Sequence, residues 1–208
     1  MEHTESRQII LSVLGIAVLI IAFVGVSYAA FNTILGQSSE NGISTGTISL
    51  VFDDDTEAIS INNAMPVADS YGKEMNGTGN VYDFSVRSIL SKGTTLNYEI
   101  SAEKLPIDGV ALSDKDVRIY LQKEENGHYV DTPITMTPQA FKPLREDSFL
   151  GSKVGNMVLY SGTLSNASDS DNELAEKFRL RIWVSKDTII DSISRKFNIK
   201  LNVTAKAI

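Results

Sequence analysis

Apolar and polar residues alternate with a period of two along most of the chain after residue 43. In the run from Val81 to Arg87, every second side chain is aromatic or aliphatic and those between are polar. A strand with one apolar and one polar face is typical of an antiparallel sheet that is buried on one side. The same pattern predicts strands at residues 47–52, 58–61, 81–87, 96–102, 117–122, 128–130, 157–164, 178–184 and 197–206.

Glycine, asparagine, aspartate and proline separate these runs, as expected of turn residues. Asn126-Gly127 lies between two of the runs and predicts a tight hairpin, because both residues adopt positive φ readily. A turn or two of helix is expected around residues 187–194. No linker interrupts residues 43–208, so the pattern predicts one all-β domain there, an antiparallel β-sandwich.

Residues 9–31 form the longest apolar stretch of the chain, and none of them is charged. As a helix they would measure roughly 34 Å, which suffices to span a bilayer. Small residues at Ser27 and Ala29 match the pattern for signal peptidase, so cleavage between Ala29 and Ala30 is expected. The alternative is a retained single-pass anchor, because Arg7 is the only basic side chain before the stretch. Both readings predict export across a membrane.

Residues 30–42 follow this signal peptide or anchor (residues 1–29) and precede the β-sandwich domain (residues 43–208). The segment is expected to be a flexible N-terminal arm, with Phe31, Ile34 and Leu35 as its apolar side chains. Once freed by cleavage, it could add as a donor strand to an unpaired sheet edge of another copy. Alternatively, it ends the membrane helix or packs on its own domain.

The charge and cysteine content narrow the range of partners. The formal net charge is −7, with 19 lysines and arginines against 26 acidic residues, so nucleic acid is not expected as a partner. The chain has no cysteine, which excludes disulfides, thiolate metal sites and cysteine nucleophiles.

Catalytic motifs are missing as well. The two histidines are His3, in the leader, and His128, beside the predicted hairpin turn. The H-E-x-x-H motif of zinc proteases and the G-x-S-x-G motif of serine hydrolases do not occur. We therefore expect a protein without catalytic residues and without a cofactor.

Two acidic runs are candidate calcium sites, because closely spaced aspartates can supply several of the oxygen ligands that Ca²⁺ needs. The first comprises residues 53–55 with Glu57. The better candidate comprises Asp169, Asp171 and Glu173, which alternate with other oxygen-bearing side chains. The alternative is that both runs are solvated turn residues.

Trp183 alternates with the apolar residues of its strand, so it should lie on the outer face of its sheet together with Arg179 and Arg181. An exposed tryptophan flanked by arginines is a candidate contact surface for a partner subunit. The alternative is that a loop covers the indole ring.

Three segments resemble a known family: Ala29-Ala30-Phe31-Asn32 after the apolar leader, the run Ile43–Leu50, and Asn63-Ala64-Met65-Pro66 before a strand. In this order they resemble the TasA/camelysin family of exported proteins, which a SipW-type signal peptidase processes. The resemblance implies a jelly-roll-like sandwich. For the fibre-forming members it implies subunits linked by N-terminal donor strands in a biofilm matrix. By position, Phe31–Leu35 would be the donor and Thr47–Phe52 the first strand of the body.

The sequence thus favours an exported structural protein of the cell surface or extracellular matrix, able to form fibres by N-terminal strand donation. Its expected partner is a second copy of itself, and the membrane would be a partner through residues 9–31 if they are retained. The alternative is a membrane-anchored extracytoplasmic binding or adhesion domain. A third hypothesis is a secreted protease similar to camelysin.

Overall fold

The computed structural model describes residues 46–52, 59–62, 64–76, 79–189 and 193–208. The chain divides into two compact units, Met1–Gly42 and Ile43–Ile208, and all described residues belong to the second. The expected cleavage site at Ala29 and Ala30, and the expected donor residues Phe31, Ile34 and Leu35, lie outside them. Within the described ranges no helix is both long and apolar enough to cross a bilayer.

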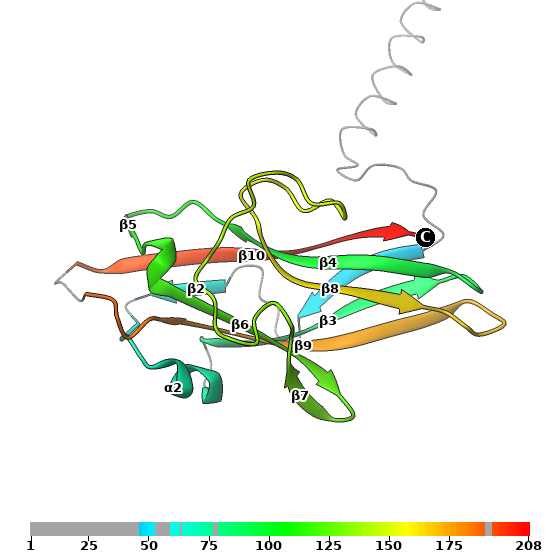
Figure 1. The fold of residues 1–208 in the computed structure, drawn as a ribbon, viewed down its shortest axis with the longest axis horizontal. Helices are drawn as coiled ribbons and strands as arrows, with labels where there is room; N and C mark the ends of the chain where they lie inside the picture. The colour runs from blue at the N-terminus through cyan, green and yellow to red at the C-terminus, as the bar shows by residue number, and fades with distance from the viewer. Residues whose placement is uncertain (1–45, 53–58, 63, 77–78, 190–192) are drawn as a thin grey trace, which may run out of the picture. The chain divides into compact units, whose positions relative to one another are not determined.

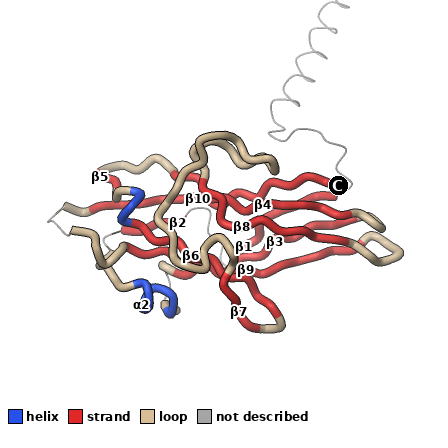
Figure 2. The backbone as a smooth tube through the Cα atoms, viewed as in Figure 1, coloured by secondary structure: helices blue, strands red, loops and turns tan. Residues whose placement is uncertain are grey.

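The described residues form two sheets, and every strand pair except one is antiparallel. The first sheet has the order β1 (Gly46–Phe52), β3 (Val81–Leu90), β9 (Asn172–Val184), β6 (Val117–Glu125) and β7 (His128–Asp131) (Figure 1). The second sheet has the order β2 (Ile59–Asn62), β10 (Arg195–Ala207), β4 (Thr95–Lys104) and β8 (Met157–Ser165), and β5 (Val110–Ala111) pairs in parallel with β10. Strands make up most of the described backbone, and loops join them at both ends (Figure 2).

The core lies between the two sheets, where the apolar faces of their strands meet. Phe84 of β3 stacks on Phe178 of β9 with ring centroids 5.5 Å apart, and Ile100 of β4 is fully buried. Each such side chain contributes about 1.5–3 kcal/mol by leaving water. The prediction of an all-β antiparallel sandwich is confirmed, and the alternation has the expected cause, because the long strands such as β3, β6 and β10 bury one face in the core.

The turns confirm the predicted hairpin and show one hydrogen-bonded contact that the sequence does not predict. Asn126 and Gly127 have φ of 53° and 81°, as the predicted tight hairpin between β6 and β7 requires. Between β8 and β9, the buried Asn166 amide donates to the carbonyls of Leu90 and Ser170, both at 2.8 Å. That amide therefore ties the β8–β9 turn to the end of β3.

The only α-helix among the described residues is α2 (Asp69–Glu74), and the sequence pattern does not predict it. A helix of this length shows too few turns for a 3.6-residue period to emerge. The helix expected around residues 187–194 is wrong for the described part: 187–189 and 193–194 form turns and irregular backbone. A short 3₁₀ turn, η1 (Asp114–Asp116), leads into β6.

Candidate functional site

The first sheet has a fork where β6 separates from β9. The two strands pair from Val117 opposite Val184 to Lys123 opposite Phe178, after which β6 turns into its hairpin with β7. Beyond this point β9 pairs with β3 alone, and no described strand lies along its other edge from Asn172 to Lys177. A depression of about 460 Å³ marks the fork, lined by Lys123, Glu124, Glu125, Asn126, Ala175, Glu176 and Lys177.

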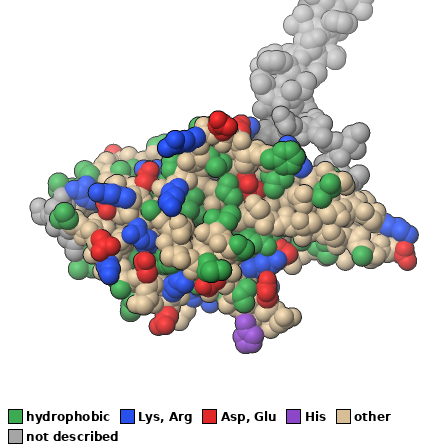
Figure 3. Space-filling view, in the orientation of Figure 1, with side chains coloured by type: hydrophobic (Ala, Val, Ile, Leu, Met, Phe, Trp, Pro, Cys, Tyr) green, Lys and Arg blue, Asp and Glu red, His purple; other side chains and the backbone are tan. Residues whose placement is uncertain are grey.

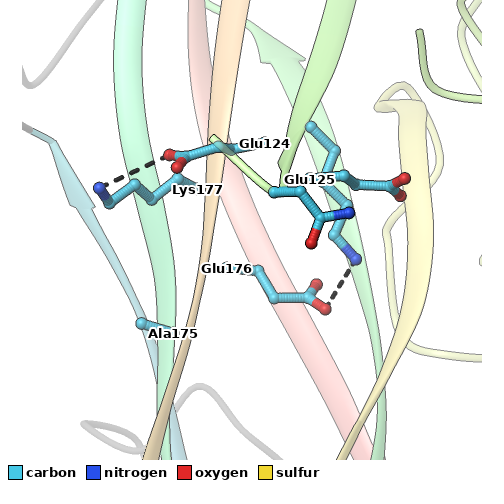
Figure 4. Close-up of a pocket in the computed structure, with 7 residues that line it drawn as sticks. Glu124, Glu125, Ala175, Glu176 and Lys177 are labelled. Carbon is cyan, nitrogen blue, oxygen red and sulfur yellow. Dashed lines mark hydrogen bonds and ion pairs between the residues drawn. The ribbon is translucent and has the colours of Figure 1, made fainter. Parts of the chain in front are cut away.

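Two ion pairs bridge the fork on opposite faces of the sheet. Lys177 of β9 contacts Glu124 of β6 at 3.5 Å, and Lys123 Nζ donates to Glu176 Oε1 at 2.7 Å. Figure 4 shows that the Glu124–Lys177 pair points to one side of the strands and Glu176 to the other. Successive side chains of a strand alternate in this way, so Lys123 and Glu176 face the interior of the sandwich.

Lys123 and Glu176 join two tyrosines of the second sheet in what we call the inner polar cluster (Tyr98, Lys123, Tyr160, Glu176). The Tyr98 hydroxyl donates to the Glu176 carboxylate, and Lys123 Nζ donates to the Tyr160 hydroxyl at 3.3 Å. Tyr98 is fully buried, whereas the Lys123 and Glu176 side chains are each 19% exposed. The cluster therefore links the two sheets next to the open edge of β9.

The charges of the cluster stabilise one another. Burial raises the pKa of Tyr98, and the adjacent Glu176 carboxylate raises it further, so this hydroxyl stays a proton donor. Burial alone would lower the pKa of Lys123, but its contacts with Glu176 and Tyr160 outweigh burial and raise it. Lys123 is accordingly charged at neutral pH.

Gly162 of β8 provides the space that the two tyrosine rings occupy. A Cβ atom there would lie 2.6 Å from the Tyr160 ring and 2.9 Å from the Tyr98 ring. Contacts this short are not tolerated, so the close packing of both rings against β8 requires glycine at this position.

The structure corrects the contact surface expected at Trp183. The indole lies on the outward face of its sheet as predicted, but it is only 1% exposed because α2 covers it. A Cβ atom on Gly72 of α2 would lie 2.2 Å from the ring, and Trp183 Nε1 donates to Asp69 Oδ1 at 3.2 Å. The alternative of a covered tryptophan is therefore confirmed, with a helix in place of the expected loop.

Arg181 is also buried, at 5% exposure, so the contact surface is wrong for this residue too. Its guanidinium donates to the Met75 carbonyl at 2.7 Å and to Gln122 Oε1 at 2.5 Å. Burial and the neighbouring Arg179 lower its pKa. Arg179 is bound through Nε and Nη2 to both Asp83 oxygens, at 2.7 and 2.6 Å, and its part in a contact surface stays a prediction.

Arg181 belongs to what we call the outer cluster, together with Lys73, Tyr120, Gln122 and Asp131. The Tyr120 hydroxyl donates to Asp131, and Lys73 Nζ of α2 approaches the other Asp131 oxygen at 3.4 Å. Lys73 also lies 4.7 Å from the centre of the Tyr120 ring and donates to the Met136 carbonyl at 2.9 Å. These contacts hold α2 against the first sheet.

The candidate calcium residues do not converge. Asp169 contacts Lys92 at 2.6 Å, Glu173 contacts Arg87 at 3.6 Å, and Asp171 is exposed. In the part of the chain that is described, no three histidine or carboxylate side chains come close enough together to hold a metal ion. Residues 53–55 and Glu57 lie outside that part. His128 is exposed beside the hairpin turn, where the sequence placed it.

The fork is the feature that sequence reasoning missed, although a signal for it exists. The inward positions of β6 read Val117, Ile119, Leu121 and then Lys123, and Glu176 precedes the inward Phe178 and Leu180 of β9. A lysine and a glutamate at positions where the alternation requires apolar residues each indicate an inward-facing charge that needs a partner.

Comparisons with known proteins leave the family open. No family model matches the chain, and no curated protein matches it. The crystal structure of the infectious bursal disease virus VP2 subviral particle is similar at 12% identity and a TM-score of 0.31, over 79% of this chain and 33% of that one. TmCBM61 in complex with beta-1,4-galactotriose is similar at 8% identity and a TM-score of 0.21, over 78% and 90%.

A third structure, described as manganese lipoxygenase of Gaeumannomyces graminis with zonadhesin of Komagataella pastoris, is similar at 14% identity and a TM-score of 0.18. The match covers 82% of this chain and 58% of that one. The chain thus spans about a third of the VP2 chain. Structural similarities with TM-scores this low do not indicate a function.

Proposed function

We propose that this chain is an exported, non-enzymatic structural protein of the cell surface or extracellular matrix, whose sandwich assembles by strand addition. In this proposal residues 30–42 form the arm, and Phe31–Leu35 of one copy supply the added strand. The jelly-roll-like arrangement implied by the TasA/camelysin resemblance belongs to the same proposal. The observation that carries it is the fork, which leaves part of β9 without a neighbour on one side among the described strands.

The fork has the dimensions and chemistry of a strand acceptor. The open stretch from Asn172 to Lys177 is about 20 Å long, which accommodates a strand of five or six residues. An added strand would satisfy the free backbone groups of β9 and would cover the inner polar cluster. Phe31 and Leu35 would lie on the same face of such a strand, because they are an even number of residues apart.

The test is a disulfide between two copies, which is straightforward because the chain has no cysteine. Two chains that begin at Ala30 are mixed under oxidation, one carrying Thr33→Cys and the other Ala175→Cys. Strand donation to the fork predicts a cross-linked heterodimer in good yield. Ser113→Cys, on an exposed turn elsewhere in the domain, is the matched control and should cross-link poorly.

Equal yields from Ala175→Cys and Ser113→Cys would contradict the assignment of the fork as acceptor. Fibre formation is examined in parallel by negative-stain microscopy of chains that begin at Ala30 and at Gly42. Fibres from the longer chain alone support donation by residues 30–41, and monomers from both contradict it. N-terminal sequencing of the natural protein shows whether residues 1–29 are removed, and their retention would support the anchored binding or adhesion domain.

A further inference from the structure

The second sheet ends in β8, whose outer edge is open. β8 pairs with β4 along one side, from Ser165 opposite Thr95 to Met157 opposite Ala102, and no described strand pairs with its other side. The preceding loop reaches only the first residue of the strand, where the Lys142 amide donates to Met157 Sδ at 3.4 Å. A bulge opposite Ile100 and Ser101 separates this start from a regular stretch, Tyr160–Ser165.

Apart from the bulge near its start, β8 lacks the features that usually protect an open edge. Its sequence, MVLYSGTLS, contains no charged residue and no proline over 9 residues. Natural edge strands are normally short, or carry lysine, proline or another charge that prevents pairing with a further strand. Figure 3 shows the same property on the surface, where the region over β4 and β8 is mostly free of charged side chains except near its tip.

The other open edges among the described residues are shorter than β8 or carry charges. The unpaired stretch of β9 carries Glu173, Glu176 and Lys177, whose charges are balanced by ion pairs within the first sheet, so it differs from β8 in charge but can still accept the arm. β7 is a strand of 4 residues that ends in Asp131. β2 is equally short, with 4 residues. β1 is also uncharged, but it is shorter than β8, with 7 residues. β8 is therefore the longest open edge without a charged residue among the described strands.

We infer that β8 pairs with β8 of a second copy, antiparallel about a two-fold axis at Gly162, so that the second sheet continues from one copy into the other. An interface that uses the same strand twice must be complementary to itself. With the axis at Gly162, Ser161 lies opposite Thr163 of the second copy, and Tyr160 lies opposite Leu164. An uncharged strand meets no like charge in this arrangement.

The side chains on each face fit this register. On the outer face, Ser161 and Thr163 are exposed hydroxyl residues, and serine–threonine pairs stabilise adjacent strands. On the inner face, Tyr160 is half-buried and Leu164 is buried in its own core, so the strand of the second copy would meet apolar side chains there. Gly162 has no side chain, so the two strands can approach closely at the axis.

This pairing goes beyond the proposed function, because it uses the second sheet and needs no residue before Gly46. It is tested on the full chain in detergent by sedimentation equilibrium. The natural chain is expected to dimerise reversibly. Ser161→Lys with Thr163→Lys places lysine opposite lysine across the axis and should raise the dimer Kd at least about tenfold.

A charge-matched variant tests the register itself. Ser161→Lys with Thr163→Glu places lysine opposite glutamate across the axis and should restore the dimer to within about threefold of the natural Kd. Asn202→Lys adds a lysine to the same face of the sheet on β10, two strands from the edge, and should leave the Kd unchanged. Fluorescence of Trp183, the single tryptophan, confirms that each variant is folded.

Three results would overturn the inference. The first is a monomeric natural chain at concentrations up to about 100 μM, where even a weak interface shows. The second is a dimer that the double lysine variant does not weaken, since that dimer would form through another surface. The third is a dimer that is lost in both double variants, because β8 would then accept some other strand and not its own copy.

Discussion

The inner polar cluster and the outer cluster each combine a tyrosine hydroxyl, a carboxylate and a lysine, yet they are closed in different ways. On the outside of the first sheet, Tyr120, Asp131 and Lys73 are held together by α2, which supplies the lysine. At the fork, Tyr98, Glu176 and Lys123 come from strands of both sheets, and no described element covers them from the side of β9.

The difference shows that the exposure of an ion pair does not follow from whether a helix packs next to it. The Lys73 and Asp131 side chains are 32% and 35% exposed although the lysine comes from a helix that packs on the sheet, whereas Lys123 and Glu176 are each 19% exposed beside an open edge. The helix shields Trp183 and Arg181 more than it shields the ion pair. We conclude that the outer cluster fastens α2, and that the inner cluster joins the sheets where a further strand can be added.

Removing the indole that α2 covers should have the largest effect. Trp183→Ala deletes a fully buried aromatic side chain together with its hydrogen bond to Asp69, and should lower the free energy of unfolding by about 3–5 kcal/mol. Guanidinium denaturation followed by circular dichroism measures it, because the variant has no tryptophan. Tyr71→Ala, on the exposed side of the same helix, is the control and should change stability by less than about 0.5 kcal/mol. Equal losses from the two variants would show that α2 does not depend on the indole.

Breaking the ion pair at the fork should have an intermediate effect. Lys123→Met removes the donor to Glu176 Oε1, while Oε2 keeps the hydrogen bond from the Tyr98 hydroxyl. The loss of the ion pair in the interior should cost about 1–3 kcal/mol. Lys123→Met with Glu176→Gln removes both charges and should recover more than half of that loss. Denaturation followed by Trp183 fluorescence measures both. Additive losses would mean that the two side chains do not interact.

Equivalent variants measure the strength of the ion pair in the outer cluster. Lys73→Met with Asp131→Asn is the equivalent pair of substitutions, and its coupling energy should be smaller, because more exposed ion pairs contribute little. A larger coupling at the outer cluster than at the fork would reverse our assignment of which pair joins structural elements more strongly.

The pH dependence at Asp131 should be the smallest effect. Burial would raise the pKa of Asp131, but hydrogen bonds from Tyr120, Gln122 and Lys73 outweigh it and hold the pKa below its ordinary value. A carboxyl whose pKa is lower in the folded state stabilises the fold above its unfolded pKa, near 3.9, and this contribution disappears as the pH falls through the folded pKa. Asp131→Asn should therefore reduce stability at pH 7 by less than about 1 kcal/mol and flatten its decline below pH 4. An unchanged acid profile would assign the decline to other carboxylates.

The strands could be predicted because each buries one face, so that period two is imposed on residues such as Tyr82, Phe84 and Val86 by the core itself. The hairpin at Asn126-Gly127 could be predicted because its backbone geometry is local. The helix α2 could not, since it is short and is held in place by Trp183, which is distant in the sequence.

The fork could not be predicted for a related reason. It exists because β6 leaves β9 after Lys123, and the pairing of these strands is set by contacts between residues far apart in the chain. The sequence shows Lys123 and Glu176 separately, each as a charge in an apolar position, but not that they meet. Tyr98 and Tyr160 read as ordinary alternating residues, and only the glycine at position 162 allows both rings to pack there.

The start of β1 and the end of the chain after β10 both lie beside the connection between β3 and β4, which has a practical consequence. Gly46 of β1 lies opposite Leu90 at the end of β3, and the Ile208 amide donates to the Thr95 carbonyl at the start of β4, at 3.0 Å. A short peptide could therefore join Ile208 to Gly46, and the chain could be reopened at Asn126-Gly127 to give a circular permutant with the same strand order in space. A cargo protein fused after Ile208 would likewise emerge beside Gly46, leaving α2 and the loops at the far end of the strands clear for display.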